Sequence, residues 1–256
     1  MRMKILIVND DGWETRGILE LAKALRERDH EPIVFAPAEN VSGQGTSMNL
    51  LPTVMIDVHE KEGIPMFAVH GTTIDCVMIG TAYAPDVDMV ISGINYGLNT
   101  GGDILTSGTV AGAQDAIRRD YPSVAVSINS YAPQHLPEVA RYFCDLLENK
   151  LKDVISNKYA LNINIPDLPV NEIKGIVVAP ISEKRWLKDI TFELNGDKMK
   201  AKFRGYKPDI SGERDTDVNY INQNYITISP ILVNYNDYNL IQNISRALNP
   251  RERGRV

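Results

Sequence analysis

Short, nearly all-apolar runs that alternate with amphipathic helical segments constrain the fold of this chain more than any other feature. Residues 4–8 form such a run, as expected of a strand covered on both faces. Apolar residues then recur at helical spacing from Ile18 to Leu25, and residues 32–36 predict a second strand. A strand–helix–strand unit places two strands in parallel through a right-handed crossover. The first 36 residues therefore predict an α/β fold.

The same alternation continues through the first two thirds of the chain. Further buried strands are predicted at residues 87–92, 123–128 and 159–165. Helices are predicted at residues 72–82, 109–118 and 137–147. We therefore expect residues 1–173 to form a layered, Rossmann-like core, in which a mostly parallel sheet carries helices on both faces.

The pattern changes after about residue 174. Residues 190–204 alternate apolar and polar side chains around the turn Asn195-Gly196-Asp197, which predicts a β-hairpin with one apolar and one strongly basic face. The simplest interpretation of the lysines is a solvated face. Because an isolated hairpin is marginally stable, its apolar face must pack on the core or on another subunit.

After the hairpin the chain returns to strand-like runs at residues 225–229 and 231–235. A final helix is predicted from the spacing of Tyr238, Ile241, Ile244 and Leu248. We expect residues 174–256 to be an extension of the core that serves oligomerisation, and not an independent domain.

Composition excludes several classes of protein. The formal net charge of −6 over 256 residues argues against a dedicated nucleic-acid binder. It leaves anionic substrates open, because a bound cation can reverse the local field. The two cysteines form no zinc pattern, no apolar run is long enough to span a bilayer, and the N-terminal run meets Asn9 too early for a signal peptide. We expect a cytoplasmic enzyme with no membrane partner.

Three polar clusters follow predicted strands, where open parallel sheets bind their ligands. Asp10 and Asp11 follow the first strand, a Gly/Ser loop at 36–45 follows the second, and a Gly/Asn-rich loop at 93–102 follows the strand at 87–92. Because the carboxyl ends of parallel strands share one edge, we expect the three clusters to meet in one crevice.

The adjacent carboxylates of Asp10 and Asp11 are the strongest chemical signal. Asn-Asp-Asp-Gly is also a good turn and helix-capping sequence. Two adjacent aspartates repel each other, however, unless a cation or hydrogen-bond donors stabilise them. With the Ser42 hydroxyl and the Asn95 amide oxygen they make a set of hard oxygen ligands that suits Mg²⁺, Mn²⁺ or Ca²⁺ better than zinc.

The segment Ser107-Gly108-Thr109 precedes an apolar helix and predicts an anion site at the helix N-terminus. Simple N-capping by Ser107 or Thr109 is the alternative. Thr72 and Asp75 have the spacing of a capping box and are expected to be structural. Trp13 could either flank the crevice or pack on the first helix.

Together these motifs resemble the SurE (survival protein E) family of metal-dependent 5′-nucleotidases, also described as acid phosphatases. The resemblance runs through nearly the whole chain in the expected order. It is carried by Ile5-Leu6-Ile7-Val8-Asn9-Asp10-Asp11-Gly12, Ala36-Pro37 through Ser42-Gly43, Ser92-Gly93-Ile94-Asn95-Tyr96-Gly97-Leu98-Asn99-Thr100-Gly101, Ser107-Gly108-Thr109-Val110, Asn162-Ile163-Asn164-Ile165-Pro166 and Thr216-Asp217. The chain departs from the family pattern at Thr15-Arg16, at Thr73, at Asp215 and at Asn224.

The resemblance implies hydrolysis of nucleoside 5′-monophosphates with one divalent cation per subunit, Mg²⁺ or Mn²⁺. It assigns the cation to Asp10, Asp11, Ser42 and Asn95, and phosphate contacts to Asn99, Ser107, Gly108 and Thr109. Either aspartate could accept the proton of the attacking water. The resemblance further implies a homodimer or homotetramer in which C-terminal elements are exchanged between subunits.

Three other functions make different demands on the sequence. A phosphatase with an aspartyl nucleophile would use an Asp-x-Asp turn, whereas Asp10 and Asp11 are adjacent. A dinucleotide oxidoreductase is disfavoured because no GxGxxG motif opens the first helix. A non-catalytic nucleotide or metal sensor on the same sheet stays open, and it would bind nucleotide without releasing phosphate.

Overall fold

The computed structural model describes residues 2–183, 187–207, 214–234 and 236–248. Nine strands form one sheet in the order β3-β4-β2-β1-β5-β6-β7-β11-β8. Their bounds are β1 Lys4–Val8, β2 Glu31–Pro37, β3 Ile56–Lys61, β4 Ile64–Val69, β5 Met89–Tyr96, β6 Ser123–Ile128, β7 Tyr159–Ile165, β8 Ile176–Val178 and β11 Ile226–Leu232. Neighbours from β4 to β7 are parallel, and only the β3–β4 and β7–β11 pairs of this sheet are antiparallel. The prediction of a mostly parallel sheet is confirmed.

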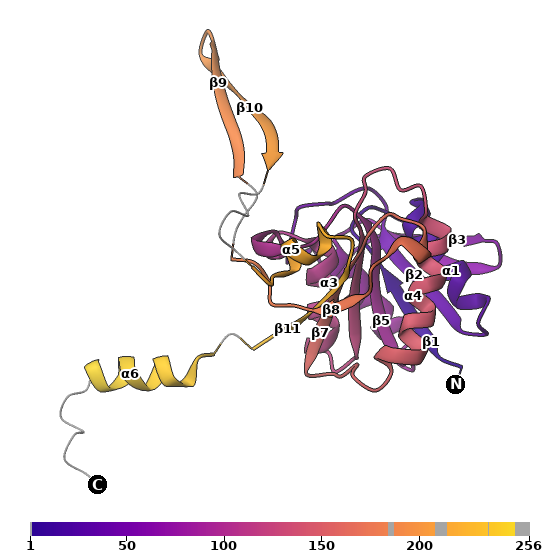
Figure 1. The fold of residues 1–256 in the computed structure, drawn as a ribbon. Helices are drawn as coiled ribbons and strands as arrows, with labels where there is room; N and C mark the ends of the chain where they lie inside the picture. The colour runs from indigo at the N-terminus through magenta and orange to yellow at the C-terminus, as the bar shows by residue number, and fades with distance from the viewer. Residues whose placement is uncertain (1, 184–186, 208–213, 235, 249–256) are drawn as a thin grey trace.

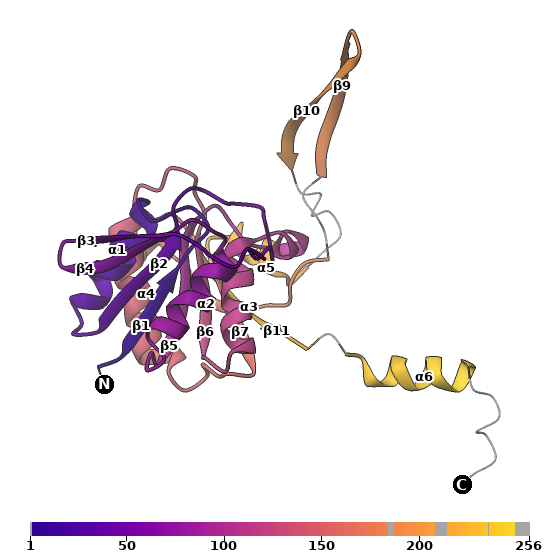
Figure 2. The ribbon, with the colours of Figure 1, turned by 180° about the vertical axis from the view of Figure 1, so that it is seen from behind.

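Helices cover both faces of the sheet (Figures 1 and 2). Helices α1 (Arg16–Arg26) and α4 (Leu136–Leu146) pack together on one face. Helices α2 (Thr73–Tyr83) and α3 (Gly108–Arg118) pack together on the other. Short helical segments complete the described chain: η1 Gly101–Leu105, η2 Leu147–Leu151, η3 Val170–Glu172 and α5 Asp217–Ile221. The layered α/β prediction therefore holds.

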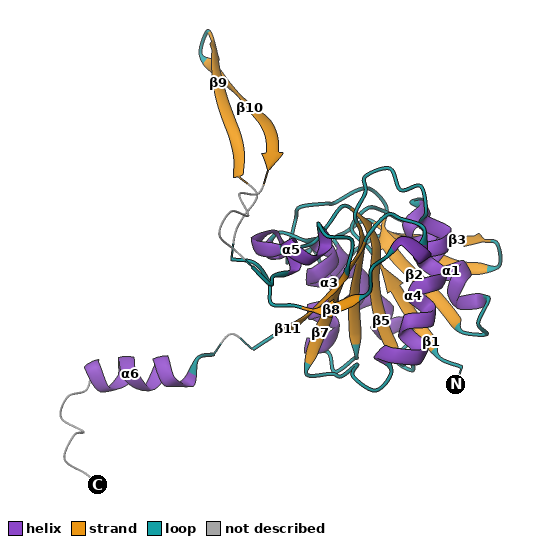
Figure 3. Cartoon of the chain, viewed as in Figure 1, coloured by secondary structure: helices purple, strands orange, loops and turns teal. Residues whose placement is uncertain are grey.

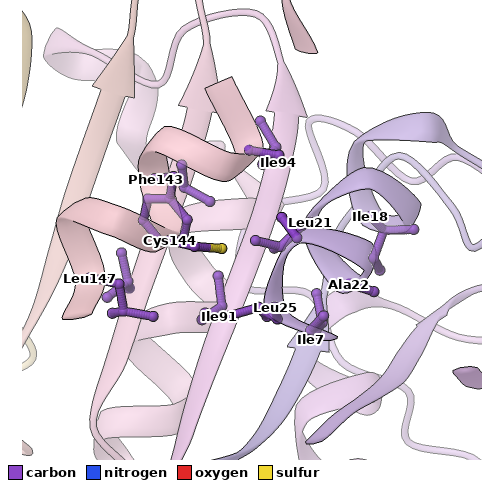
Figure 4. Packing of buried hydrophobic residues seen from close by; sticks show 14 of the residues in the cluster. Ile7, Ile18, Leu21, Ala22, Leu25, Ile91, Ile94, Phe143, Cys144 and Leu147 are labelled. Carbon is purple, nitrogen blue, oxygen red and sulfur yellow. The ribbon is translucent and has the colours of Figure 1, made fainter. Parts of the chain in front are cut away.

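The larger part of the core lies between the sheet and the α1–α4 face (Figure 4). Ile7 of β1 and Ile91 of β5 meet Leu21 and Leu25 of α1, with Phe143 of α4 beside them. All five side chains are fully buried. Burial of a large aliphatic or aromatic side chain contributes roughly 1.5–3 kcal/mol. This packing makes the sheet a rigid support for the loops at its carboxyl edge.

Two appendages extend from this body (Figures 1 and 3). Strands β9 (Leu187–Asn195) and β10 (Lys198–Lys207) form a separate antiparallel hairpin, which confirms the prediction at 190–204. Helix α6 (Tyr238–Leu248) also stands away from the sheet, and none of its residues is buried. No helix of the described chain is both long and apolar enough to cross a membrane.

The sequence prediction misses strands β3, β4 and β8 and helix α5, and it differs from the structure at β11. Strands β3 and β4 were not predicted, because polar residues dominate β3 and Pro65 interrupts the apolar run of β4. The two strands predicted at 225–229 and 231–235 are one strand, β11, that runs through Pro230 and ends at Leu232; residue 235 lies outside the described residues. Proline is tolerated there because β8 pairs with β11 only as far as Ile228, so the missing N–H of Pro230 faces an open edge.

Candidate functional site

The three predicted polar clusters meet at the carboxyl edge of the parallel strands. They line one pocket of about 490 Å³. Six of the predicted site residues line it, namely Asp10, Asp11, Ser42, Asn95, Asn99 and Ser107. A volume of this size suits a small organic ligand, for which pockets of roughly 300–1,000 Å³ are typical.

A buried asparagine shapes the turn that carries the two carboxylates. Asn9 accepts a hydrogen bond from the Gly12 N–H at 3.2 Å and donates to the Gly12 carbonyl oxygen at 2.9 Å. The Val41 N–H donates to the Asp10 carbonyl oxygen at 2.8 Å and ties the Ser42 loop to the turn. The sequence contained Asn9 within the motif, but its role in closing the turn emerges only from these bonds.

Asp10 is only 3% exposed and lies against the N-terminus of α3. The Thr109 hydroxyl donates to its Oδ1 at 2.5 Å, and a Cβ at Gly108 would lie 2.8 Å from its Oδ2. Burial raises the pKa of Asp10, while the Thr109 hydroxyl and the N–H groups of Thr109 and Gly108 oppose that shift. The helix N-terminus predicted to bind a substrate anion thus holds the carboxylate of Asp10, and glycine is required at 108 for this approach.

Asp11 is the more accessible of the two acids. Its Oδ2 accepts from the Tyr96 N–H at 3.2 Å, and the Ser42 hydroxyl donates to its Oδ1 at 3.4 Å. Burial, followed by the charge of Asp10, raises the pKa of Asp11 to about 6. No lysine, arginine or histidine among the described residues lines this pocket. The paired carboxylates therefore lack a positive partner in the described chain.

Asn95 lies in β5 and not in a loop after it, because the strand continues to Tyr96. The β5–β6 register shifts between Ser92 and Asn95, at a point where Gly93 has φ +141° and a Cβ would meet the Val126 carbonyl oxygen at 2.3 Å. The Asn95 side-chain amide nitrogen donates to the Gly97 carbonyl oxygen at 2.8 Å. This bond leaves its amide oxygen as the group for a ligand.

Asn99 is held by two asparagines of β7. Asn164 accepts from the Asn99 N–H at 2.9 Å, and the side chains of Asn162 and Asn164 donate to the Asn99 carbonyl oxygen at 2.7 and 3.0 Å. The Asn99 side chain donates to Ser127 at 2.8 Å. Sequence motifs contained Asn162 and Asn164, but the strand order was needed to show that they position the pocket loop.

The remaining predicted residues divide between site and scaffold. Ser107 lines the pocket and also caps α3, since its hydroxyl accepts from the Val110 N–H at 3.1 Å. Thr109 is fully buried and engages Asp10. Thr72 and Asp75 form the predicted capping box of α2. The Trp13 ring stacks on His59 with ring centroids 4.1 Å apart, and it does not line the pocket.

The donor set fits a hard divalent cation. Two carboxylates, a hydroxyl and an amide oxygen are the ligands that Mg²⁺ and Mn²⁺ prefer. Two adjacent acids with raised pKa values and no cationic neighbour are the electrostatic complement of such an ion.

Known proteins resemble this chain in sequence. The sequence model of the family described as Survival protein SurE matches residues 5–188. A protein named 5′-nucleotidase SurE from Desulfovibrio desulfuricans is 33% identical over 246 residues, covering 92% of this chain and 95% of that protein. Another of that name from Dehalococcoides mccartyi is 36% identical, over 90% of this chain and 88% of its own.

A solved structure agrees with these sequence matches. The crystal structure of SurE protein from Aquifex aeolicus superposes with a TM-score of 0.84 at 29% identity, and the alignment covers 96% of this chain and 99% of that one. The resemblance inferred from the motifs is therefore confirmed. This chain belongs to the SurE family.

Proposed function

We propose that the protein is a metal-dependent 5′-nucleotidase that hydrolyses nucleoside 5′-monophosphates to nucleoside and phosphate. One observation carries the proposal: two adjacent carboxylates, Asp10 buried and Asp11 half-buried, share a pocket in which no described side chain is cationic. The pocket lies at the carboxyl edge of a parallel sheet, where such folds bind ligands. The relatives named 5′-nucleotidase SurE support the same reaction.

Asp10, Asp11, Ser42 and Asn95 would hold one divalent cation, Mg²⁺ or Mn²⁺. When bound, the cation supplies Lewis-acid polarisation of a phosphoryl oxygen and a lowered pKa for a water ligand. The Thr109 hydroxyl and the start of α3 hold the Asp10 carboxylate in a fixed orientation. Asp11 is the better placed proton acceptor, because it is the more accessible acid and its oxygens accept only two hydrogen bonds in the described chain.

Asn99 and Ser107 are the proposed phosphate contacts. Both line the pocket with polar side chains, and both are fixed by the scaffold beneath them. Donors that are held in place before the substrate arrives stabilise developing charge without reorganisation. Gly108 and Thr109 act on phosphate only through Asp10 in this arrangement, because their donors face its carboxylate.

We further propose that residues 1–173 form the catalytic core and that 174–256 extend it for assembly. The support is the apolar face of the hairpin and the wholly exposed helix α6. Exchange of these elements between two or four copies would cover them. The mass of the protein in solution tests this part.

A phosphate-release assay tests the reaction. Nucleoside 5′-monophosphates are assayed with EDTA, and again after Mg²⁺ or Mn²⁺ is restored. Release is expected only with metal, and Asp11→Ala is expected to abolish it while the circular dichroism spectrum is retained. A variant that keeps its turnover would refute the site. Nucleotide binding by wild type without phosphate release would indicate a sensor.

A further inference from the structure

The pocket combines two chemically different surfaces. Its polar part is made by the carboxylates, hydroxyls and amides described above. Its remaining wall includes an apolar corner formed by Gly97, Leu98 and the ring of Tyr131. Phosphate and its cation need only the polar part. An aromatic ring in the same pocket indicates a substrate that carries, besides its phosphate, a planar group with apolar faces.

The Tyr131 ring is seated on the backbone of Gly97. A Cβ at Gly97 would lie 2.7 Å from Cε1 of Tyr131, so the ring packs on the bare α-carbon. The Gly97 N–H donates to the carbonyl oxygens of Ile128 and Ser130, each at 3.0 Å, which ties the segment before Tyr131 to the end of β5, the strand of Asn95. The ring position is thus coupled to the strand that carries a proposed cation ligand.

Tyr131 nevertheless remains 87% exposed. Most large aromatic side chains are at least partly buried, because their exposed area is costly in water. No hydrogen bond from its hydroxyl occurs within the described part of the chain. The protein therefore holds a ring at the rim of the pocket and leaves most of its surface for another molecule.

We propose that Tyr131 is the residue on which the nucleobase of the substrate stacks. The proposal rests on the nucleotidase function above and deepens it, since it gives the site a means to favour nucleotides over phosphomonoesters without a base. Stacking tolerates any base, because every base has a π-face. Tyr131 therefore distinguishes substrates that carry a base from those that carry none, and it does not distinguish one base from another.

Paired substrates test this role. Adenosine 5′-monophosphate carries a base, and ribose 5-phosphate presents the same phosphoester without one. In Tyr131→Ala, KM for the nucleotide is expected to rise about tenfold, within the range for loss of one stacked base, while kcat changes little. Both constants for ribose 5-phosphate should stay at their wild-type values. Tyr131→Phe, which keeps the ring, should behave as wild type.

Tyr83→Ala serves as a matched control, because Tyr83 is also an exposed tyrosine but does not line the pocket. It should leave both substrates unaffected. Equal losses on both substrates in Tyr131→Ala, or no loss on the nucleotide, would overturn the stacking role. Equal losses would instead identify a structural contribution through Gly97.

Calorimetric titration with adenosine separates this inference from the proposed function, because it requires no hydrolysis. Adenosine is expected to bind wild type and Tyr131→Phe equally, and Tyr131→Ala about tenfold more weakly. If wild type releases no phosphate but shows this binding pattern, the nucleotidase proposal fails and the stack stands. If wild type hydrolyses nucleotides and adenosine binds Tyr131→Ala as tightly as wild type, only the stack fails.

Discussion

The carboxyl edge of the sheet and the C-terminal appendages, hairpin β9–β10 and helix α6, present opposite kinds of surface: the edge presents carboxylates, and the appendages present apolar side chains. At the sheet edge, the buried Asp10 and the half-buried Asp11 accept hydrogen bonds, yet the described chain supplies no positive charge to the pocket. In the appendages, apolar residues such as Phe192 and Leu194 are exposed, 62% and 83%. Within the described residues, the sheet edge therefore presents negative charge and the appendages present apolar surface.

This difference indicates what each region must bind. An excess of buried negative charge is stabilised by a counter-ion, whereas exposed apolar surface is stabilised by contact with another apolar surface. The register of the hairpin places Ile190 opposite Phe203, Phe192 opposite Ala201 and Leu194 opposite Met199. These cross-strand partners share one face, so the hairpin presents a continuous apolar side. Its opposite side carries the lysines.

Replacement of Asp11 by asparagine separates charge from shape at the sheet edge and is expected to give the largest effect. Asparagine can keep the bond from the Tyr96 N–H but cannot accept a proton or balance a cation. Activity should fall by at least about 10³-fold. The phosphate-release assay with restored metal measures it. A loss below about tenfold would remove Asp11 from the proposed chemistry.

The same substitution should stabilise the metal-free protein. The pKa of Asp11 rises from 3.8 to about 6 on folding, so the folded protein binds this proton more tightly than the unfolded chain. Stability from this group is present below pH 3.8, is lost as the pH rises through 6, and stays lost above it. In EDTA at pH 7.5, Asp11→Asn should therefore gain on the order of 2 kcal/mol, and urea unfolding at pH 4.5 and 7.5 checks the sign.

Phe192→Asp is the corresponding test of the appendages. A charge on the apolar face of the hairpin would be costly to bury at an interface, by several kcal/mol. Light scattering should show the mass falling toward that of one chain. Lys198→Asp places the same charge on the opposite face, across from Asn195, and should leave the mass unchanged. An unchanged mass in Phe192→Asp would show that this face is not an interface.

Periodicity predicted the elements whose side chains face the core. The runs at 123–128 and 159–165 coincide with β6 and β7, because strands buried on both faces are mostly apolar. Edge strand β3 has no such requirement, and its His59, Glu60 and Lys61 gave no strand signal. Local sequence thus predicts an element where its periodicity is regular, as in the exposed hairpin β9–β10, and misses one where polar residues or a proline interrupt the pattern, as in β3 and β4.

The site was predictable as a set of residues but not as a geometry. Residue type and strand order were enough to bring Asp10, Asp11, Ser42 and Asn95 to one pocket. The orientation of α3 toward Asp10 was not predictable, because it depends on a bare α-carbon at Gly108 meeting a carboxylate 98 positions away. The Tyr131 contact with Gly97 has the same origin in tertiary packing.

Asn164→Ala tests how strongly the side chains beneath the pocket position the Asn99 loop. We expect its effect on activity to be intermediate. The substitution leaves the buried Asn99 N–H without its acceptor and should cost about 2 kcal/mol of unfolding free energy. Because the Asn99 loop then shifts, kcat/KM should also fall by roughly tenfold. Urea unfolding and steady-state kinetics measure the two effects. Asn149→Ala, an exposed asparagine that bonds only Asp145 in the described chain, should change neither.

Thr72→Ala gives the smallest effect and marks the boundary between site and scaffold. Thr72 caps α2 by accepting from the Asp75 N–H at 3.4 Å, and its hydroxyl donates to the Ser47 carbonyl oxygen at 2.7 Å. Loss of such a cap should cost about 1 kcal/mol, which thermal unfolding measures, and Thr72→Ser should restore it. The kinetic constants should not change, because neither Thr72 nor Asp75 lines the pocket. If Thr72→Ala lowers kcat/KM and Thr72→Ser restores it, the Thr72 hydroxyl contributes to catalysis as well as to capping α2. The functional site would then extend to the start of α2.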